Sequence, residues 1–299
     1  MFLNKQTGIY NLDDVKGFEG ALNYYLNMTK GFKSSFDDMI TINVDGYNII
    51  DESKSNPYGA KSRFGEYLVQ NIKEDEIVYV QPRVGFAGIS LSYLCKKYNK
   101  KLTLVMPSSK KSSDHQRLCI EMGAKPLFCR IAAMPNANRL AKQYAKKNNA
   151  FFVPLGLKHE YVTANAVRCI YDYFKDKEKP KRMWSVISTG VLTRALQIAL
   201  PDTEFFAVAV ARNIQQGELG RAKFYSYHKA FTSKSDIVPD EFDSESCYDS
   251  KGWDYMLKYG QKGDWFFNVA GQAPEPVLKA ESIDSYRDWN DLKDFIDVF

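Results

Sequence analysis

The feature that most limits the possible folds is an alternation, from Glu76 onward, of short β-forming runs with amphipathic helical stretches. This order is typical of a parallel sheet whose faces are covered by the helices that join its strands. The predicted strands are Ile77–Val80, Leu102–Met106, Lys125–Cys129, Phe151–Pro154, Trp184–Ile187 and Phe205–Ala209. The predicted helices are Gly85–Tyr98, Ser112–Met122, Ala137–Lys147, Tyr161–Lys175 and Thr193–Ala199. We therefore expect an α/β protein with twisted, parallel-rich sheets.

Two further local patterns add detail. Ser112, Ser113 and Asp114 offer N-terminal caps for one helix, and Gly123 stands where a left-handed residue would end it. The stretch Thr232–Ser250 is polar and acidic without a clear period, which predicts a long surface loop or lid.

Composition places the chain among ordinary globular proteins. Of its residues, 44% are hydrophobic and 26% are charged, as in soluble globular domains. Its length of 299 residues is sufficient for two packed domains. The longest apolar runs are much shorter than the roughly 20 residues of a membrane span, and the N-terminus does not read as a signal peptide. These features predict no membrane association and a cytoplasmic location.

The cysteines and histidines give no sign of a disulfide framework or a metal site. The five cysteines are odd in number and include no C-x-x-C pair. The three histidines, His115, His159 and His228, lie far apart without ligand spacing. We expect reduced thiols and no metal.

The charge pattern leaves two interpretations open. The net charge is +5, and basic residues gather at Lys100–Lys101, Lys110–Lys111 and Lys179–Arg182. Such clusters can neutralise nucleic-acid phosphates, and the aromatic content of 14% could supply stacking platforms. Solvated helix ends and turns produce the same clusters.

One lysine stands in a context that favours chemistry. Lys61 follows the turn-forming segment Asn56-Pro-Tyr-Gly-Ala and opens an apolar-periodic helix. A lysine amine is a useful nucleophile only when its pKa is lowered, and a desolvated helix N-terminus has that effect. An exposed helix that merely begins with Lys and Arg is the alternative for this segment taken alone.

The segment around Lys61 resembles 1-aminocyclopropane-1-carboxylate deaminase and D-cysteine desulfhydrase, within the tryptophan-synthase-β-like (fold type II) pyridoxal-phosphate enzymes. That family carries Gly-Gly-Asn-Lys-x-Arg-Lys-x-Glu-Tyr-Leu. The residues matching it in register are Gly59, Lys61, Arg63, Glu66, Tyr67 and Leu68. The resemblance implies that Lys61 forms the Schiff base with the cofactor.

Other segments match the family in its order, from about Ile40 to Gly271. They are Leu102–Pro107 with Glu121–Ala124, Phe152–Gly156 with His159–Ala164, and Cys247–Gly252 ahead of a helix ending at Lys262-Gly263 and a strand at Trp265. The resemblance implies a large domain of residues 1–75 and 151–299, a small α/β domain of residues 76–150, and a cofactor site in the cleft between them. It also implies a homodimer, and Tyr248 aligns with a family tyrosine close to the substrate.

The loop Ser188-Thr189-Gly190, followed by Thr193, lies between a predicted strand and helix, where backbone N–H groups can hold a phosphate. The family has Gly-Ser-Gly-Gly-Thr here and binds the cofactor phosphate with it. Only Gly190 remains as glycine, while Ser188, Thr189 and Thr193 offer hydroxyl groups.

Three contacts of the family pattern are altered. Phe86 replaces an asparagine that contacts the cofactor ring hydroxyl, and the family's substrate-carboxylate loop has become Arg83-Val-Gly85 with Ala87. Arg83 could bind a carboxylate through its guanidinium. Val269 replaces a threonine facing the ring nitrogen, a role for which Asn268 is the available substitute.

The sequence thus predicts pyridoxal-phosphate-dependent lyase, deaminase or decarboxylase chemistry on a small amino-acid-like amine through Lys61. Two alternatives stay open. One is the same fold acting on or binding an aminated nucleotide or nucleic acid. The other is a non-catalytic relative without cofactor, in which aromatic side chains such as Phe86 fill the pocket.

Overall fold

The computed structural model describes residues 3–4, 9–10, 18–107, 111–129, 134–210, 214 and 216–280. The chain divides into two compact units, Met1–Tyr67 with Lys158–Gln272, and Leu68–Leu157 with Ala273–Phe299. The expected domains, residues 1–75 with 151–299 and residues 76–150, have other limits and stay a prediction. Of the basic clusters, Lys110 lies outside the described residues.

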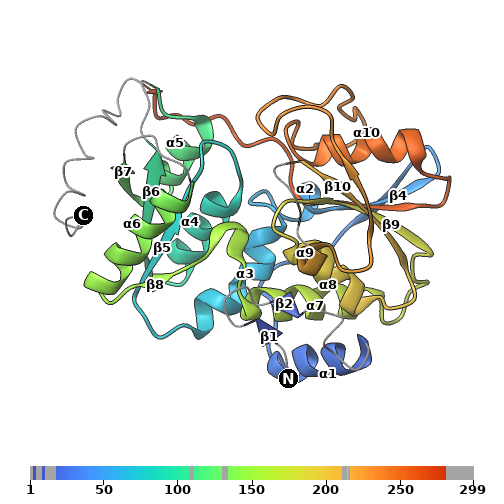
Figure 1. Ribbon diagram of the computed structural model, residues 1–299, viewed down its shortest axis with the longest axis horizontal. Helices are drawn as coiled ribbons and strands as arrows, with labels where there is room; N and C mark the ends of the chain where they lie inside the picture. Colours follow the sequence, from blue (N-terminus) through green and yellow to red (C-terminus); the bar gives the residue numbers. More distant parts are fainter. Residues whose placement is uncertain are drawn as a thin grey trace. The chain divides into compact units, whose positions relative to one another are not determined.

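The first unit is built on a six-stranded sheet of order β11-β10-β9-β12-β4-β3. Figure 1 labels three strands of this sheet, β4, β9 and β10. Its strands are β3 (Thr41–Val44), β4 (Tyr47–Asp51), β9 (Arg182–Ile187), β10 (Glu204–Ala209), β11 (Lys223–Ser226) and β12 (Trp265–Asn268). All neighbouring strands are parallel except β3, which pairs with β4 as a hairpin. The helices are α1 (Phe18–Met28), α2 (Glu52–Ser55), α3 (Ala60–Asn71), α7 (Glu160–Phe174), α8 (Val191–Ala199), α9 (Gln216–Leu219) and α10 (Asp249–Tyr259). A short strand pair, β1 (Leu3–Asn4) and β2 (Ile9–Tyr10), completes its elements.

Alternation along β9 shows how this sheet is covered. Trp184 and Val186 point to one face and pack with Trp253 of α10, because successive strand residues face opposite sides. Ser185 points to the other face, where its hydroxyl lies 3.1 Å from that of Thr193 in α8. The sheet is therefore buried on both faces, as parallel sheets usually are.

The second unit is a four-stranded parallel sheet of order β7-β6-β5-β8. Its elements are β5 (Glu76–Val80), α4 (Ala87–Lys97), β6 (Lys101–Pro107), α5 (Asp114–Glu121), β7 (Lys125–Cys129), α6 (Met134–Lys147), β8 (Phe151–Phe152) and a 3₁₀ turn, Leu155–Leu157. Ala137, Ala141 and Tyr144 of α6 pack on Val78 and Val105 of the sheet.

The predicted α/β class and parallel-rich sheets are confirmed. The six predicted strands form, although β8 is only two residues long because Pro154 has no N–H to donate and a 3₁₀ turn follows. Ser113 caps α5 in a full capping box with Gln116, and Gly123 follows that helix with φ of 97°.

Two expectations need correction. The helix expected to end at Lys262-Gly263 ends at Tyr259, because Gly260 takes up an extended conformation while its N–H still bonds to Met256. The stretch Thr232–Ser250 is irregular only as far as Tyr248, because α10 begins at Asp249, and it is not confined to the surface, since Phe242 belongs to the core and Ser244 is buried. No helix in the described part of the chain has the length and apolar character needed to cross a bilayer.

Candidate functional site

Lys61 is the second residue of α3, at the start of the helix as the sequence predicts. A sharp turn directly precedes the helix. Gly59 has φ of +76°, a left-handed conformation that glycine adopts without strain. The N–H of Ala60 then donates to the carbonyl of Val269, at 2.7 Å. The start of α3 is thereby tied to the chain that leaves the carboxyl end of β12.

Lys61 faces the start of α10. Its Nζ lies 5.8 Å from the centre of the Tyr248 ring. Loss of hydration lowers the pKa of Lys61, and the neighbouring carboxyl group of Asp249 opposes that shift. Proton loss from Lys61 is therefore easier than from an ordinary lysine, as a nucleophilic amine requires.

Asp249, the first residue of α10, is the site residue that sequence reasoning missed. It is fully buried, and neither carboxyl oxygen has a hydrogen-bond partner in good geometry among the described residues. Burial raises the pKa of Asp249 well above its usual range, and the opposing influences of Lys61 and of the Val269 and Ala270 backbone N–H groups do not cancel the effect. A signal was available, because an aspartate directly after Tyr248 opens a helix.

Tyr248 precedes α10 as its N-cap residue. Burial is the main cause that raises the pKa of the Tyr248 hydroxyl, and Asp249 adds to it. The hydroxyl group therefore keeps its proton near neutral pH. This favours Tyr248 as a ring contact beside Lys61 over its use as a base.

The predicted phosphate loop lies between β9 and α8. Gly190 is the N-cap of α8 with φ of 78°, and no side chain caps this helix. A Cβ on Gly190 would lie 2.7 Å from the carbonyl oxygen of Glu218, so only glycine fits. Thr193 is buried and faces Ser185, whereas Ser188 and Thr189 are partly exposed at the turn.

Asn268 ends β12 and is fully buried. Its Nδ2 donates to Asp51 Oδ1 at 2.9 Å and to the carbonyl of Asp243 at 2.8 Å. Its Oδ1 has no hydrogen-bond partner among the described residues. The side chain can therefore only offer an acceptor to a ligand.

The remaining predicted residues belong to the second unit. Gly85 has φ of 137°, and Phe86 is the buried N-cap of α4, edge-on to the His115 ring at 5.6 Å. Arg83 is exposed and donates from Nη1 to the carbonyl of Lys111 at 3.0 Å. The buried side chain of Gln81 accepts a hydrogen bond from the N–H of Gly88 at 2.9 Å. One of the free N–H groups in the first turn of α4 is thereby already bonded.

Two of the basic clusters have structural contacts. Lys100 donates to the carbonyls of Ile72 and Glu74. Arg182 lies 3.3 Å from a carboxyl oxygen of Asp264. These contacts favour the interpretation of the two clusters as parts of strand and turn ends.

Comparison with solved structures places the chain in a fold group. A homologue of ACC deaminase superposes with a TM-score of 0.68 at 14% identity, over 91% of this chain and 99% of that one. Threonine deaminase isoform 2 of Solanum lycopersicum gives 0.64 at 9% identity, over 93% and 94%. Maize serine racemase gives 0.66 at 8% identity, over 87% and 94%.

No protein-family model matches the sequence, and no curated protein matches it at a significant level. Identities of this size carry information about fold alone. The strand orders and these superpositions agree on one architecture: the chain has the tryptophan-synthase-β-like fold, that of fold type II pyridoxal-phosphate enzymes, as a divergent example.

Proposed function

We propose that the chain is a pyridoxal-phosphate-dependent enzyme of the lyase or deaminase class, acting on an amino-acid-like amine, with Lys61 as the cofactor-binding residue. The observation that carries the proposal is the placement of the Lys61 amine, whose Nζ lies 5.8 Å from the centre of the Tyr248 ring and within electrostatic reach of the buried carboxyl group of Asp249, where loss of hydration lowers the pKa of Lys61. The solved neighbours include threonine deaminases, serine racemase and an ammonia lyase.

Buried atoms near Lys61 fit the proposed cofactor. Oδ1 of Asn268 and the oxygens of Asp249 are buried acceptors without a hydrogen bond in good geometry among the described residues. Buried acceptors are normally satisfied, and a protonated ring nitrogen is a donor that could satisfy one of them. The uncapped first turn of α8 fits a phosphate group.

The residues that would hold the cofactor are accordingly Lys61 through its amine, Ser188, Thr189 and Gly190 at the phosphate, and Asn268 through Oδ1. Thr193 is the weakest member of the predicted set because its hydroxyl faces Ser185. The contributions of Phe86, Gly85 and Arg83 stay predictions.

When bound, pyridoxal phosphate supplies an aldehyde that condenses with amines and a ring that withdraws electrons from the bond to be broken. Lys61, released as a neutral amine, would accept and return a proton at Nζ. Asp249 would hold a proton beside it, and the Tyr248 ring would limit the access of water. The bond cleaved depends on how the substrate is oriented.

The test is covalent trapping. The purified protein is incubated with pyridoxal phosphate, reduced with borohydride and digested, and the labelled lysine is identified by mass spectrometry. We expect the label on Lys61, together with a visible absorbance band before reduction that Lys61→Ala abolishes. Lys251→Met is the matched control, because it removes a buried lysine from the first turn of another helix of the same unit.

Label spread over surface lysines, with no band that depends on Lys61, would overturn the proposal and favour the cofactor-free alternative. The expected homodimer is measured on the same sample by light scattering.

A further inference from the structure

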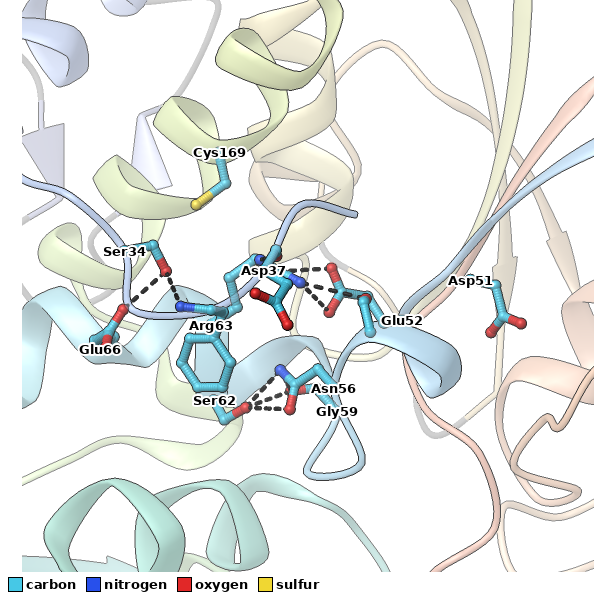
Figure 2. A network of polar contacts seen from close by, with 12 residues as sticks. Ser34, Asp37, Asp51, Glu52, Asn56, Gly59, Ser62, Arg63, Glu66 and Cys169 are labelled. Carbon is cyan, nitrogen blue, oxygen red and sulfur yellow. Dashed lines mark hydrogen bonds and ion pairs between the residues drawn. The ribbon is translucent and has the colours of Figure 1, made fainter. Parts of the chain in front are cut away.

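The turn that presents Lys61 is organised by one side chain, that of Asn56. Figure 2 shows Asn56 facing Gly59 and Ser62 below the ion pair of Arg63 and Glu52. Asn56 Nδ2 donates to the Gly59 carbonyl at 2.9 Å and lies 2.7 Å from Ser62 Oγ. Its Oδ1 accepts from the Tyr58 N–H at 3.1 Å.

The hydrogen bonds of the Asn56 side chain surround Lys61 in the sequence. Their partners lie on both sides of it, at residues 58, 59 and 62, and Ser62 is the residue directly after Lys61. Asn56 is 1% exposed and Ser62 is fully buried, so water cannot easily replace the bonds. Asn56 also closes the preceding helix, since its N–H donates to the Glu52 carbonyl at 2.7 Å.

The body of α3 has further contacts, although the Asn56 side chain also interacts with the Glu52 carboxyl group. Arg63 Nε donates to Glu52 Oε1 at 2.8 Å, and both side chains are buried. The carbonyl of Arg63 accepts from Asn165 Nδ2 at 2.7 Å. Removing the Asn56 side chain would therefore loosen the turn and the first turn of α3 while the helix stays in place.

From this geometry we propose that Asn56 is a positioning residue for Lys61: its side chain fixes the 56–60 turn so that the Lys61 amine is presented toward Tyr248 and Asp249. The inference rests on the proposed function only in treating the Lys61 amine as the reactive group. It adds a residue that does not itself touch the amine. A polar side chain of this kind is suited to the task because it can bond to backbone groups on both sides of a turn.

The consequence is measurable without cofactor. If the turn loosens, Lys61 gains water and its pKa moves up toward that of an ordinary lysine. The protein is treated with formaldehyde and cyanoborohydride at a series of pH values, and methylation of each lysine is quantified by mass spectrometry. Only the neutral amine reacts, so the midpoint of the Lys61 profile reports its pKa.

We expect Asn56→Ala to raise the Lys61 midpoint by about one pH unit, which lowers its methylation at neutral pH about tenfold. Ser62→Ala removes one partner and should move the midpoint in the same direction by less. The matched control is Asn43→Ala, because Asn43 Oδ1 likewise accepts from the N–H of Gly46 in a turn with positive φ, outside the Lys61 site.

A folded Asn56→Ala protein whose Lys61 profile superimposes on the wild-type profile would overturn the inference, as would an equal shift in Asn43→Ala. If Asn56→Ala does not fold, Ser62→Ala decides by the same criterion. The proposed function fails separately, when the wild-type protein takes up no pyridoxal phosphate on Lys61 although the methylation profiles differ as expected.

Discussion

The first turns of α3 and α10 each carry a lysine in the same unit, and the two lysines are held differently. Loss of hydration lowers the pKa of both Lys61 and Lys251. Lys251 Nζ donates to the carbonyls of Ala230 and Phe231, at 2.8 and 3.0 Å. Lys61 Nζ makes no hydrogen bond to a described residue and faces an aromatic ring and a buried carboxyl group.

Loss of hydration and a lowered pKa therefore do not by themselves identify a reactive lysine. An amine committed to carbonyl oxygens holds the chain together, and in this molecule Lys251 anchors the irregular stretch that precedes α10. An amine without an acceptor is available to a ligand. The difference lies in the neighbouring atoms, which sequence position alone does not reveal.

The largest expected effect on stability comes from removing the buried ion pair that holds α3, the helix that carries Lys61. Arg63→Met removes the cationic partner of the buried Glu52 carboxyl group, and removing one partner of a buried ion pair typically destabilises a protein by about 3–5 kcal/mol. We expect a loss of this size in the free energy of unfolding, measured with urea. Glu52→Leu combined with Arg63→Met should recover most of it, because no charge is then left buried.

A double variant as unstable as Arg63→Met alone would show that the Arg63 side chain acts through packing rather than through its charge.

A smaller effect on the free energy of unfolding is expected when each of the two lysines is replaced in turn. Hydrogen bonds from charged donors contribute about 1.5–3 kcal/mol, so Lys251→Met should lower the free energy of unfolding by about 2 kcal/mol. Lys61→Met should leave it unchanged or raise it slightly, because it removes a desolvated amine without an acceptor. Equal losses in the two variants, measured by urea unfolding, would remove the distinction between a structural and an available lysine.

The last effect is a difference in pH dependence. The pKa of Asp249 is raised in the folded state, so its contribution to stability is present below its unfolded pKa and is lost as pH rises through the folded pKa. Asp249→Asn resembles the protonated acid at all pH values. The variant should therefore match the wild type near pH 4 and become the more stable of the two as pH rises to 8.

Urea unfolding at several pH values measures this difference. A constant difference between the two proteins across the range would show that Asp249 does not titrate as described. Asn56→Ala and covalent trapping at Lys61 complete the set of tests.

The parallel sheets could be predicted from sequence because buried strands and amphipathic helices have different periods. The β3–β4 hairpin was missed although its signal was present, since Asp45 and Gly46 both adopt positive φ in a two-residue turn. The position of Lys61 at the head of a helix was predictable from local residues. The electrostatic influence of Asp249 on Lys61 was not, because the two residues come from segments far apart in the chain.

Asn268 illustrates the same limit at one residue. The family resemblance suggests it for a ring-nitrogen contact, but which of its atoms remains available depends on two distant residues. Asp51 becomes its neighbour only when β4 and β12 pair, and Asp243 comes from the irregular stretch before α10.

The place of β12 in the sheet also has a consequence for biosynthesis. β12 is the last strand of its unit along the chain, yet it lies between β9 and β4 near the middle of the sheet. Until residues 265–268 have left the ribosome, the strand that joins the two halves of the sheet is missing. One half consists of β3 and β4, and the other of β9, β10 and β11. Lys61 belongs with the first half, and the carbonyl that anchors its helix arrives only with Val269. The proposed Lys61 site can therefore be completed only after this last strand has been synthesised, and a chain arrested before Trp265 would carry Lys61 without the Val269 carbonyl.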